Sequence, residues 1–425
     1  MSSLSLLLWI TLGVVIQLAV FLGIGFWRHW LEFQALRRTE PDLRFPMRAS
    51  ASIDADDAKL AAWSGFRKFR VDRKIIEDTA QSVCSFYLVP EDKQPLASFQ
   101  PGQFLTFRLD VPAQTGVSEQ IIRCYSLSDA PRSDYYRVSI KRVLAPPGSE
   151  VPAGRSSSFF HDHVDTGSVL QVRAPAGHFH IDRSEDPMVL IAGGIGITPM
   201  LSMVNWCLAE QPGREVWLFY GVRNGREMLM KSHLEALAAA EPNFHLRVCF
   251  SQPMPDDQAG RDYQHRGHID VQLLRLELPL KPYHFYVCGP TPMMESLVPA
   301  LADWGVPEDR IHFEAFGPAS IKRRQVAMTA AAMPMSEHAE RAIVVSFARC
   351  GKQLPWQSAA GSLLEFAEAN GMAVTSGCRA GSCGSCQTTI QSGEVAYLQL
   401  PEYDPEPGTC LLCVSVPNTS VTLDL

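Results

Sequence analysis

The chain has 425 residues, of which 46% are hydrophobic and 20% are charged. At about 150 residues per domain this length predicts about three domains, and the composition excludes a disordered chain, a fibrous repeat and a membrane protein with many spans. The net charge of −7 gives no overall field that would attract nucleic acid. The 11 cysteines are too few for a disulfide scaffold, but five of them lie close together near the C-terminus. This clustering predicts a metal centre.

The first element is an uncharged, apolar stretch from Leu4 to Trp27. As a helix it is long enough to cross a hydrocarbon core of ~30 Å. Arg28, Arg37 and Arg38 follow it and no basic residue precedes it. This pattern predicts a transmembrane anchor over residues 1–30 of a single-pass membrane protein, with the other domains in the cytoplasm and a bacterial inner membrane as the expected location. The alternative, a cleaved signal peptide, lacks a basic start and a small-residue cleavage site.

A polar, Ala- and Asp-rich tether is expected over residues 31–62. Short β-branched and aromatic runs separated by turn residues then predict an antiparallel β-barrel domain over 63–183. The expected strands lie within 66–75, 85–89, 101–110, 123–129 and 135–143.

The pattern changes near residue 187, where buried strands begin to alternate with helical stretches. The expected strands are 188–192, 216–222 and 284–290, with helices between them. This alternation predicts an α/β domain with a doubly wound parallel sheet over 184–316. A linker is expected over 317–340 and a final domain over 341–425.

The strongest motif is Cys378-x4-Cys383-x2-Cys386, with Cys410 and Cys413 further along the chain. Four thiolates at this spacing are typical of a plant-type [2Fe–2S] cluster. The residues between them are mostly small, as a loop that wraps a cluster requires. A structural zinc site is the alternative, but its usual pair of short CxxC knuckles is missing.

With this motif, the run GCRAGSCGSCQTTIQSGEV resembles a plant-type ferredoxin domain. Upstream, the box Arg123-Cys124-Tyr125-Ser126, the run AGGIGITP (192–199) and Cys288-Gly289-Pro290 are similar to the ferredoxin–NADP⁺ reductase superfamily. The resemblance covers about residues 63–425 and is closest to flavin reductases fused to a C-terminal ferredoxin, which serve oxygenases and desaturases. It implies a flavin-binding barrel, a nucleotide domain and an α+β domain of the β-grasp type.

The resemblance implies that the box at residues 123–126 binds flavin. Arg123 can hold a diphosphate, Tyr125 can stack on the flavin ring and the Ser126 hydroxyl can reach the flavin nitrogen that receives a hydride. The hydroxyl-rich start of the next helix, with Gly154 and Ser157, suits a second phosphate and favours FAD over FMN. Leu127, Ser128 and Phe316 complete the expected flavin contacts.

The glycines of the second run let backbone N–H groups meet a pyrophosphate, and Pro199 can start the helix behind them. The nucleotide site is expected to include Gly193, Gly194, Gly196, Thr198, Pro199, Arg223, Gly289 and Pro290. The resemblance places Cys288 beside the nicotinamide, so that Ser126 and Cys288 are the expected catalytic residues. A structural turn for the glycines and a packed apolar thiol for Cys288 are the alternatives. Arg223 could meet a 2′-phosphate or stack on adenine, and NADH is favoured over NADPH because no pair of a second basic residue and a tyrosine follows it in the pattern typical of NADPH enzymes.

Spacing alone leaves either Cys410 or Cys413 as the fourth iron ligand. The resemblance selects Cys413, because the family ligand is followed four residues later by proline, here Pro417. The expected ligands are therefore Cys378, Cys383, Cys386 and Cys413.

Together these features predict a membrane-anchored NAD(P)H-dependent oxidoreductase. The expected cofactors are FAD, a [2Fe–2S] cluster and NADH or NADPH. Electrons are expected to pass from NAD(P)H to FAD, then to the cluster, and then to a terminal oxygenase, a desaturase or another acceptor protein, with no nucleic-acid partner. Two alternatives remain open: a reductase of small acceptors such as quinones or ferric chelates, and a membrane redox sensor with little turnover.

Overall fold

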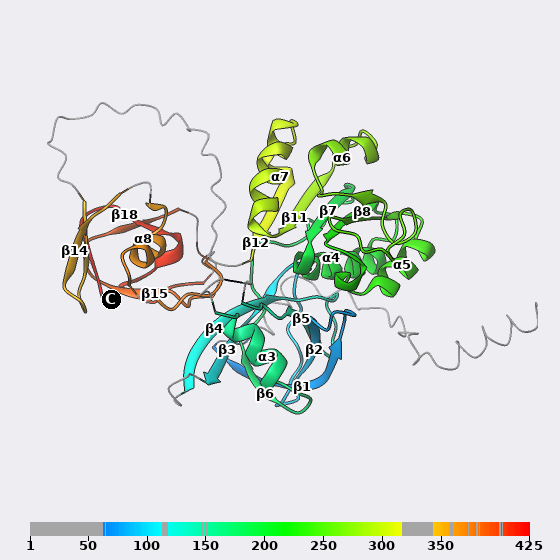
Figure 1. Ribbon diagram of the computed structural model, residues 1–425. Helices are drawn as coiled ribbons and strands as arrows, with labels where there is room; N and C mark the ends of the chain where they lie inside the picture. Colours follow the sequence, from blue (N-terminus) through cyan, green and yellow to red (C-terminus); the bar gives the residue numbers. More distant parts are fainter. Residues whose placement is uncertain are drawn as a thin grey trace, which may run out of the picture. The chain divides into compact units, whose positions relative to one another are not determined.

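The computed structural model describes residues 63, 65–112, 118–145, 148, 152–316, 343–357, 360–372, 374–379, 381, 383–398, 401 and 403–425 (Figure 1). The predicted anchor, tether and linker lie outside these residues. Over the part of the chain that is described, no helix is both long and apolar enough to cross a bilayer. The longest described helix, α4 (Ile197–Glu210), has 14 residues and measures about 21 Å, against a hydrocarbon core of ~30 Å. The prediction of a single-pass membrane protein is corrected on this finding and is withdrawn.

The five predicted strands of the first domain and a sixth that was not predicted, β6, form one antiparallel sheet in the order β4-β3-β6-β1-β2-β5 (Figure 1). Its strands are β1 (Arg67–Ile76), β2 (Val83–Pro90), β3 (Phe104–Pro112), β4 (Ser118–Ser126), β5 (Tyr136–Lys141) and β6 (Val169–Val172). Alternate residues such as Leu105, Phe107 and Leu109 face a buried core. Helix α3 (Arg155–His163) contributes the fully buried Phe160 to that core.

This sheet is a half-barrel and not the closed barrel that the sequence predicts. In the described residues its edge strands β4 and β5 do not form a ladder; just after β4, the bridge between Leu127 and Val138 and the Ser128 N–H, which donates to the Arg137 carbonyl at 2.8 Å, connect the chain to β5. Beyond that bridge the chain reaches Asp129, which turns toward helix α4 of the next domain. The Ser202 hydroxyl donates to the Asp129 carbonyl at 2.7 Å, and the Asn205 amide donates to its carboxylate at 2.8 Å. These contacts connect this segment to α4, while Asp129 also forms an ion pair with Arg137 of β5.

Asp129 anchors the contact between the half-barrel and the nucleotide domain. It is 4% exposed and lies between Arg132 and Arg137. Burial alone would raise the pKa of this carboxyl, but the two guanidinium groups and the hydrogen bond from Asn205 hold it below its usual value. A buried charge with this many partners fixes the two domains in one register.

The second domain is a parallel six-stranded sheet in the order β10-β9-β8-β7-β11-β12. Its strands are β7 (Met188–Gly193), β8 (Val216–Val222), β9 (Phe244–Phe250), β10 (His265–Arg266), β11 (His284–Gly289) and β12 (Ile311–Ala315). Strand β7 is flanked by β8 on one side and β11 on the other. The direction of winding therefore reverses at β7, and open α/β sheets bind ligands at the carboxyl ends of the strands beside such a reversal.

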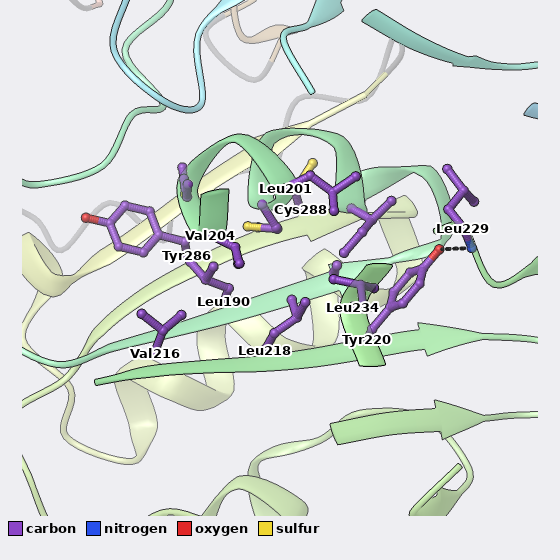
Figure 2. Close-up of a cluster of buried hydrophobic side chains, with 14 of the residues drawn as sticks. Leu190, Leu201, Val204, Val216, Leu218, Tyr220, Leu229, Leu234, Tyr286 and Cys288 are labelled. Atoms are coloured by element: carbon purple, nitrogen blue, oxygen red, sulfur yellow. Dashed lines mark hydrogen bonds between the residues drawn. The ribbon is translucent and has the colours of Figure 1, made fainter. Parts of the chain in front are cut away.

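Helices cover both faces of this sheet. Helices α4 and α5 (Lys231–Ala240) pack against the face that includes Leu190, and α6 (Val271–Glu277) and α7 (Thr291–Asp303) pack against the opposite face, which includes Ile191. Figure 2 shows the first of these cores, where Tyr220 accepts a hydrogen bond from the Leu229 N–H at 3.4 Å. Both faces of the central strands are apolar because both are covered.

The last domain is a mixed five-stranded sheet, in the order β14-β13-β19-β15-β17, with a two-stranded sheet of β16 and β18 beside it. Its strands are β13 (Val344–Phe347), β14 (Lys352–Pro355), β15 (Gln387–Ser392), β16 (Val395–Tyr397), β17 (Thr409–Leu411), β18 (Ser415–Pro417) and β19 (Val421–Leu423). Helix α8 (Leu363–Ala369) starts with a capping box between Ser362 and Glu365 and packs on this core. The predicted α+β character of the domain is confirmed.

Candidate cofactor sites

Strand β4 positions the residues of the predicted flavin box. Tyr125 packs edge-on against Phe107 and Phe160 at centroid distances of 5.8 and 5.2 Å. Its hydroxyl lies 2.7 Å from the hydroxyl of Ser156, at the start of α3. Burial raises the pKa of Tyr125 to about 12, so the phenol keeps its proton at neutral pH. The side chain of Arg123, by contrast, is exposed, and its fork of N–H donors can reach a diphosphate.

The start of α3 supplies a second part of this site. None of the side chains caps the helix at Gly154, so its first backbone N–H groups can receive an anion. The Ser157 hydroxyl donates to the Gly154 carbonyl at 3.0 Å and accepts the Val143 N–H at 3.1 Å. Ser157 therefore fastens the turn, and its neighbour Ser156 is the serine that meets Tyr125. Three adjacent serines look alike in the sequence, and only the phase of the helix distinguishes them.

Leu127 and Ser128, also expected at the flavin, lie inside the half-barrel and are fully buried. The Ser128 hydroxyl lies 2.8 Å from the Ser139 hydroxyl and close to Arg137. Leu127 and Ser128 therefore lie in the core behind the predicted flavin site. Phe316, in contrast, lies just after β12 and is 37% exposed, as a residue that covers a ligand should be.

A partner of Ser126 was not predicted from the sequence. The Ser126 hydroxyl donates to the Glu314 carboxyl at 3.5 Å, which brings the end of β4 next to β12 of the nucleotide domain. Burial raises the pKa of Glu314 to about 8, so this carboxyl is mostly protonated at neutral pH. A neutral acid and a hydroxyl thus meet between the two domains. The available signal was a single acid in the apolar run IHFEAF.

The glycine-rich turn after β7 meets the turn after β11. A side chain at Gly196 would overlap the Cys288 carbonyl, and one at Gly193 would come within 2.7 Å of Pro290. These glycines therefore permit close packing of two chain segments. Gly194 differs from them: its φ is +54°, and a side chain there would meet nothing within 4 Å. The open side of this turn, at the carboxyl edge of the sheet, has room for a phosphate group.

Thr198 and Pro199, which follow this turn in helix α4, help to hold the turn in place. The Thr198 hydroxyl donates to the Ile195 carbonyl at 3.1 Å, and Thr198 and Pro199 are both buried. Cys288 is also fully buried, and Figure 2 shows it in the core with Leu201 and Val204. Burial, and then the nearby Glu314, raise the pKa of this thiol.

Arg223 follows β8 at the same edge of the sheet. It forms an ion pair with Glu227, whose carboxylate also lies 3.4 Å from the Lys141 ammonium group. Glu227 is the less exposed partner, at 14% against 63% for Arg223. The guanidinium that could meet a phosphate is therefore already paired with a carboxylate.

The four predicted iron ligands lie together as two pairs. The N–H of Cys378 donates to the Cys383 sulfur at 3.2 Å, and the N–H of Cys383 donates to the Cys378 sulfur at 3.3 Å. The Cys413 thiol contacts both Cys386 and Cys378, which links the pairs. In the described part of the chain no three acidic, His or Cys side chains form a group suited to a single metal ion. Two linked thiol pairs fit a cluster in which each of two irons takes two sulfurs.

Cys410 is separate from these pairs. It is fully buried in the core of the last domain, with its backbone paired to Thr388 of β15. Burial raises the pKa of this thiol to about 12, and the Ser415 side chain is its hydrogen-bond partner. These are the surroundings of a packed, protonated thiol.

Comparison with protein-family models identifies three domains in the same order. The chain matches an oxidoreductase FAD-binding domain over residues 70–181, an oxidoreductase NAD-binding domain over 190–298 and a 2Fe-2S iron-sulfur cluster binding domain over 350–418. These matches cover the half-barrel, the parallel sheet and the mixed sheet. The predicted cofactors are thereby confirmed as FAD, a pyridine nucleotide and a [2Fe–2S] cluster.

Among curated proteins, the chain is 40% identical over 258 residues to a flavohemoprotein of Halalkalibacterium halodurans, and 37% identical over 278 residues to one of Bacillus thuringiensis. The matches cover 60% and 64% of this chain. The chain spans 61% and 67% of the length of these two relatives, so the similarity covers only their reductase part.

Two solved structures are similar in fold and in sequence. The FAD/NAD-binding domain of a nitric oxide dioxygenase from Vibrio cholerae has a TM-score of 0.52 and 32% identity, and the match covers 60% of this chain and all of that one. Phthalate dioxygenase reductase, described as transferring electrons from pyridine nucleotides to [2Fe–2S], has a TM-score of 0.51 and 26% identity, over 85% of this chain and 98% of that one. The chain therefore belongs to the ferredoxin-reductase-like oxidoreductases, with FAD-binding, NAD-binding and [2Fe–2S] domains in one polypeptide.

Proposed function

We propose that this oxidoreductase passes electrons from NADH to a separate acceptor protein, with an oxygenase or a desaturase as the expected class. The observation that carries the proposal is the presence of linked thiol pairs in the same chain as the flavin and nucleotide sites. A pyridine nucleotide gives up two electrons as a hydride, and an iron–sulfur centre carries one at a time. When bound, the flavin supplies the conversion between the two.

In this proposal Arg123 and the start of α3 hold the flavin diphosphate, and Tyr125 packs against the flavin. Ser126 and Glu314 hold a hydroxyl and a proton at the junction of the two domains, where hydride transfer is expected. The turn at Gly194 binds the pyrophosphate of the nucleotide, and Cys288 packs beneath the nicotinamide. Cys378, Cys383, Cys386 and Cys413 bind the cluster.

NADH is the proposed donor because of the ion pair between Arg223 and Glu227. A 2′-phosphate at the end of β8 would have to compete with the Glu227 carboxylate for the Arg223 guanidinium, and would also be repelled by that carboxylate. A ribose 2′-hydroxyl has no such difficulty, and a carboxylate is a hydrogen-bond acceptor for it. The pairing of Arg223 therefore supports NADH over NADPH.

Two acceptors distinguish this function from the alternatives. Ferricyanide takes electrons from the flavin, whereas cytochrome c stands in for a protein acceptor served by the cluster. We expect steady NADH oxidation with both, and loss of only the cytochrome c activity when a cluster ligand is replaced. Wild-type reduction of ferric chelates or quinones by such a variant would indicate a reductase of small acceptors. Negligible turnover with every acceptor would indicate a redox sensor.

A further inference from the structure

Strand β4 carries the thiol of Cys124, to which the proposed function assigns no role. Cys124 lies between Arg123 and Tyr125, and because side chains alternate along a strand it faces the side opposite to theirs. There its thiol lies next to the sulfur of Cys383. Its neighbour across the ladder is Thr106 of β3, whose hydroxyl lies 3.4 Å from the Cys124 sulfur. The second residue of the flavin box therefore touches a proposed cluster ligand.

Arg173, just after β6, also contacts Cys383. Its N–H donates to the Thr106 carbonyl at 2.9 Å, which places it next in the row of strands. Its guanidinium donates to the backbone carbonyl of Cys383. The same group lies over two rings, Phe66 at 4.8 Å and Tyr403 at 5.4 Å. These three contacts hold the Arg173 guanidinium in one position.

Two tight contacts complete this arrangement. A side chain at Gly384 would come within 2.6 Å of the Tyr403 ring, so the ring lies directly on the cluster loop. A side chain at Gly377 would lie 2.9 Å from the Cys383 sulfur and 3.4 Å from Ile122, which is on the same face of β4 as Cys124. We call Phe66, Thr106, Ile122, Cys124 and Arg173 the barrel seat, because these residues of the flavin domain receive the loop.

We propose that the barrel seat holds the cluster loop in place and that the Cys124 thiol donates a hydrogen bond to the Cys383 sulfur, which favours the reduced cluster. Reduction adds one electron to the cluster, and Cys124 keeps its proton throughout. A donor to a ligand sulfur stabilises the added negative charge and so raises the reduction potential. The inference rests on the proposed function in one respect, that Cys383 is an iron ligand.

This arrangement also shortens the path between the two cofactors. Tyr125 faces the proposed flavin site and Cys124 faces the cluster, so one strand has a cofactor on each of its faces. The contacts made by Arg173 keep the distance between the cofactors fixed. Loss of Arg173 should therefore slow electron transfer from flavin to cluster and leave transfer from NADH to flavin unchanged.

The test is a redox titration of the purified, full-length holoprotein followed by the EPR signal of the reduced cluster. In Cys124→Val we expect the equilibrium constant for cluster reduction to fall about tenfold, which is about 59 mV for one electron. Cys124→Ser keeps a donor and should retain most of the wild-type potential. The control is Cys84→Val, which removes a buried thiol of the same half-barrel, near His161, and should leave the potential unchanged. A wild-type potential in Cys124→Val overturns the hydrogen bond.

Stopped-flow reduction of Arg173→Met by NADH tests the seat itself. We expect the flavin to be reduced at the wild-type rate and the cluster at least tenfold more slowly. Cluster reduction at the wild-type rate in Arg173→Met overturns the barrel seat. This test does not depend on Cys124→Val, so it holds even if that variant binds no iron. Absence of iron and of an EPR signal from the wild-type protein would instead refute the proposed function. The two failures are thus distinguishable.

Discussion

Replacement of Glu314 by glutamine should change how the stability of the protein depends on pH. Burial raises the pKa of the Glu314 carboxyl from 4.5 to about 8. At 1.36 kcal/mol per pH unit, this difference of about 3.5 makes the ionised group about 5 kcal/mol less favourable in the folded protein than in the unfolded chain. The glutamine amide that replaces the carboxyl cannot ionise and does not carry this cost.

The sign follows from proton counting. Between pH 4.5 and about 8 the folded protein holds a proton on Glu314 that the unfolded chain has released. The free energy of unfolding of the wild type therefore falls by about 1.4 kcal/mol per pH unit through this group, and the loss is complete above pH 8. From pH 5.5 to pH 7.5, Glu314→Gln should gain about 2.7 kcal/mol relative to the wild type.

Urea unfolding of both proteins at pH 5.5, 6.5 and 7.5 measures this difference directly. Glu314→Asp is the control, because it keeps an ionisable carboxyl and should follow the wild type more closely than the glutamine variant does. A difference between Glu314→Gln and wild type that stays constant across this pH range would refute the reasoning. It would mean that Glu314 is ionised, and not a proton-bearing partner of Ser126, at neutral pH.

Three further outcomes follow from the sites. Cys413→Ser should abolish the EPR signal and cytochrome c reduction while ferricyanide reduction survives, and Cys410→Ser should keep all three; the reverse pattern would exchange the two assignments. Gly196→Ala forces a side chain onto the Cys288 carbonyl and should cost about 2–3 kcal/mol in thermal or urea unfolding, whereas Gly213→Ala, with open space around it, should change stability by less than about 0.5 kcal/mol. Glu227→Gln releases Arg223 and should raise kcat/KM for NADPH relative to NADH about tenfold, that is, by about 1.4 kcal/mol; an unchanged ratio counts against this basis for NADH preference.

Features that depend on local pattern could be predicted from the sequence. The apolar run before the glycines forms β7, and the helix expected behind it is α4. The helix expected after Gly154 is α3. The cysteine spacing also predicted a cluster domain, because three of the predicted ligands come from one short loop and the fourth, Cys413, from the turn between β17 and β18.

Features that depend on distant contacts could not be predicted. The partner of Ser126 is 188 residues away, and a single acid in an apolar run does not by itself identify Glu314 as that partner. The same holds for Gly196, whose close contact is with Cys288 on another strand. The sequence predicts that this glycine serves a ligand, and the structure shows in addition that its lack of a side chain permits the close contact with Cys288. Cys124 was likewise an arbitrary residue within a motif until its contact with Cys383 was visible.

The predicted anchor shows a different limit. Its evidence was the composition of residues 1–30, which the structure does not describe, and the described helices give no span. The half-barrel shows a third limit of prediction from sequence. Periodicity predicted most of its strands, but it does not determine whether the edge strands β4 and β5 pair with each other.

The most direct test of electron transfer from NADH through the flavin to the cluster is an anaerobic titration of the full-length protein with NADH, followed by flavin absorbance and by EPR. We expect NADH to bleach the flavin and then to produce the signal of one reduced [2Fe–2S] cluster per chain, and we expect the signal to be absent in Cys413→Ser. A flavin that bleaches while a fully assembled cluster stays oxidised would contradict this order of transfer.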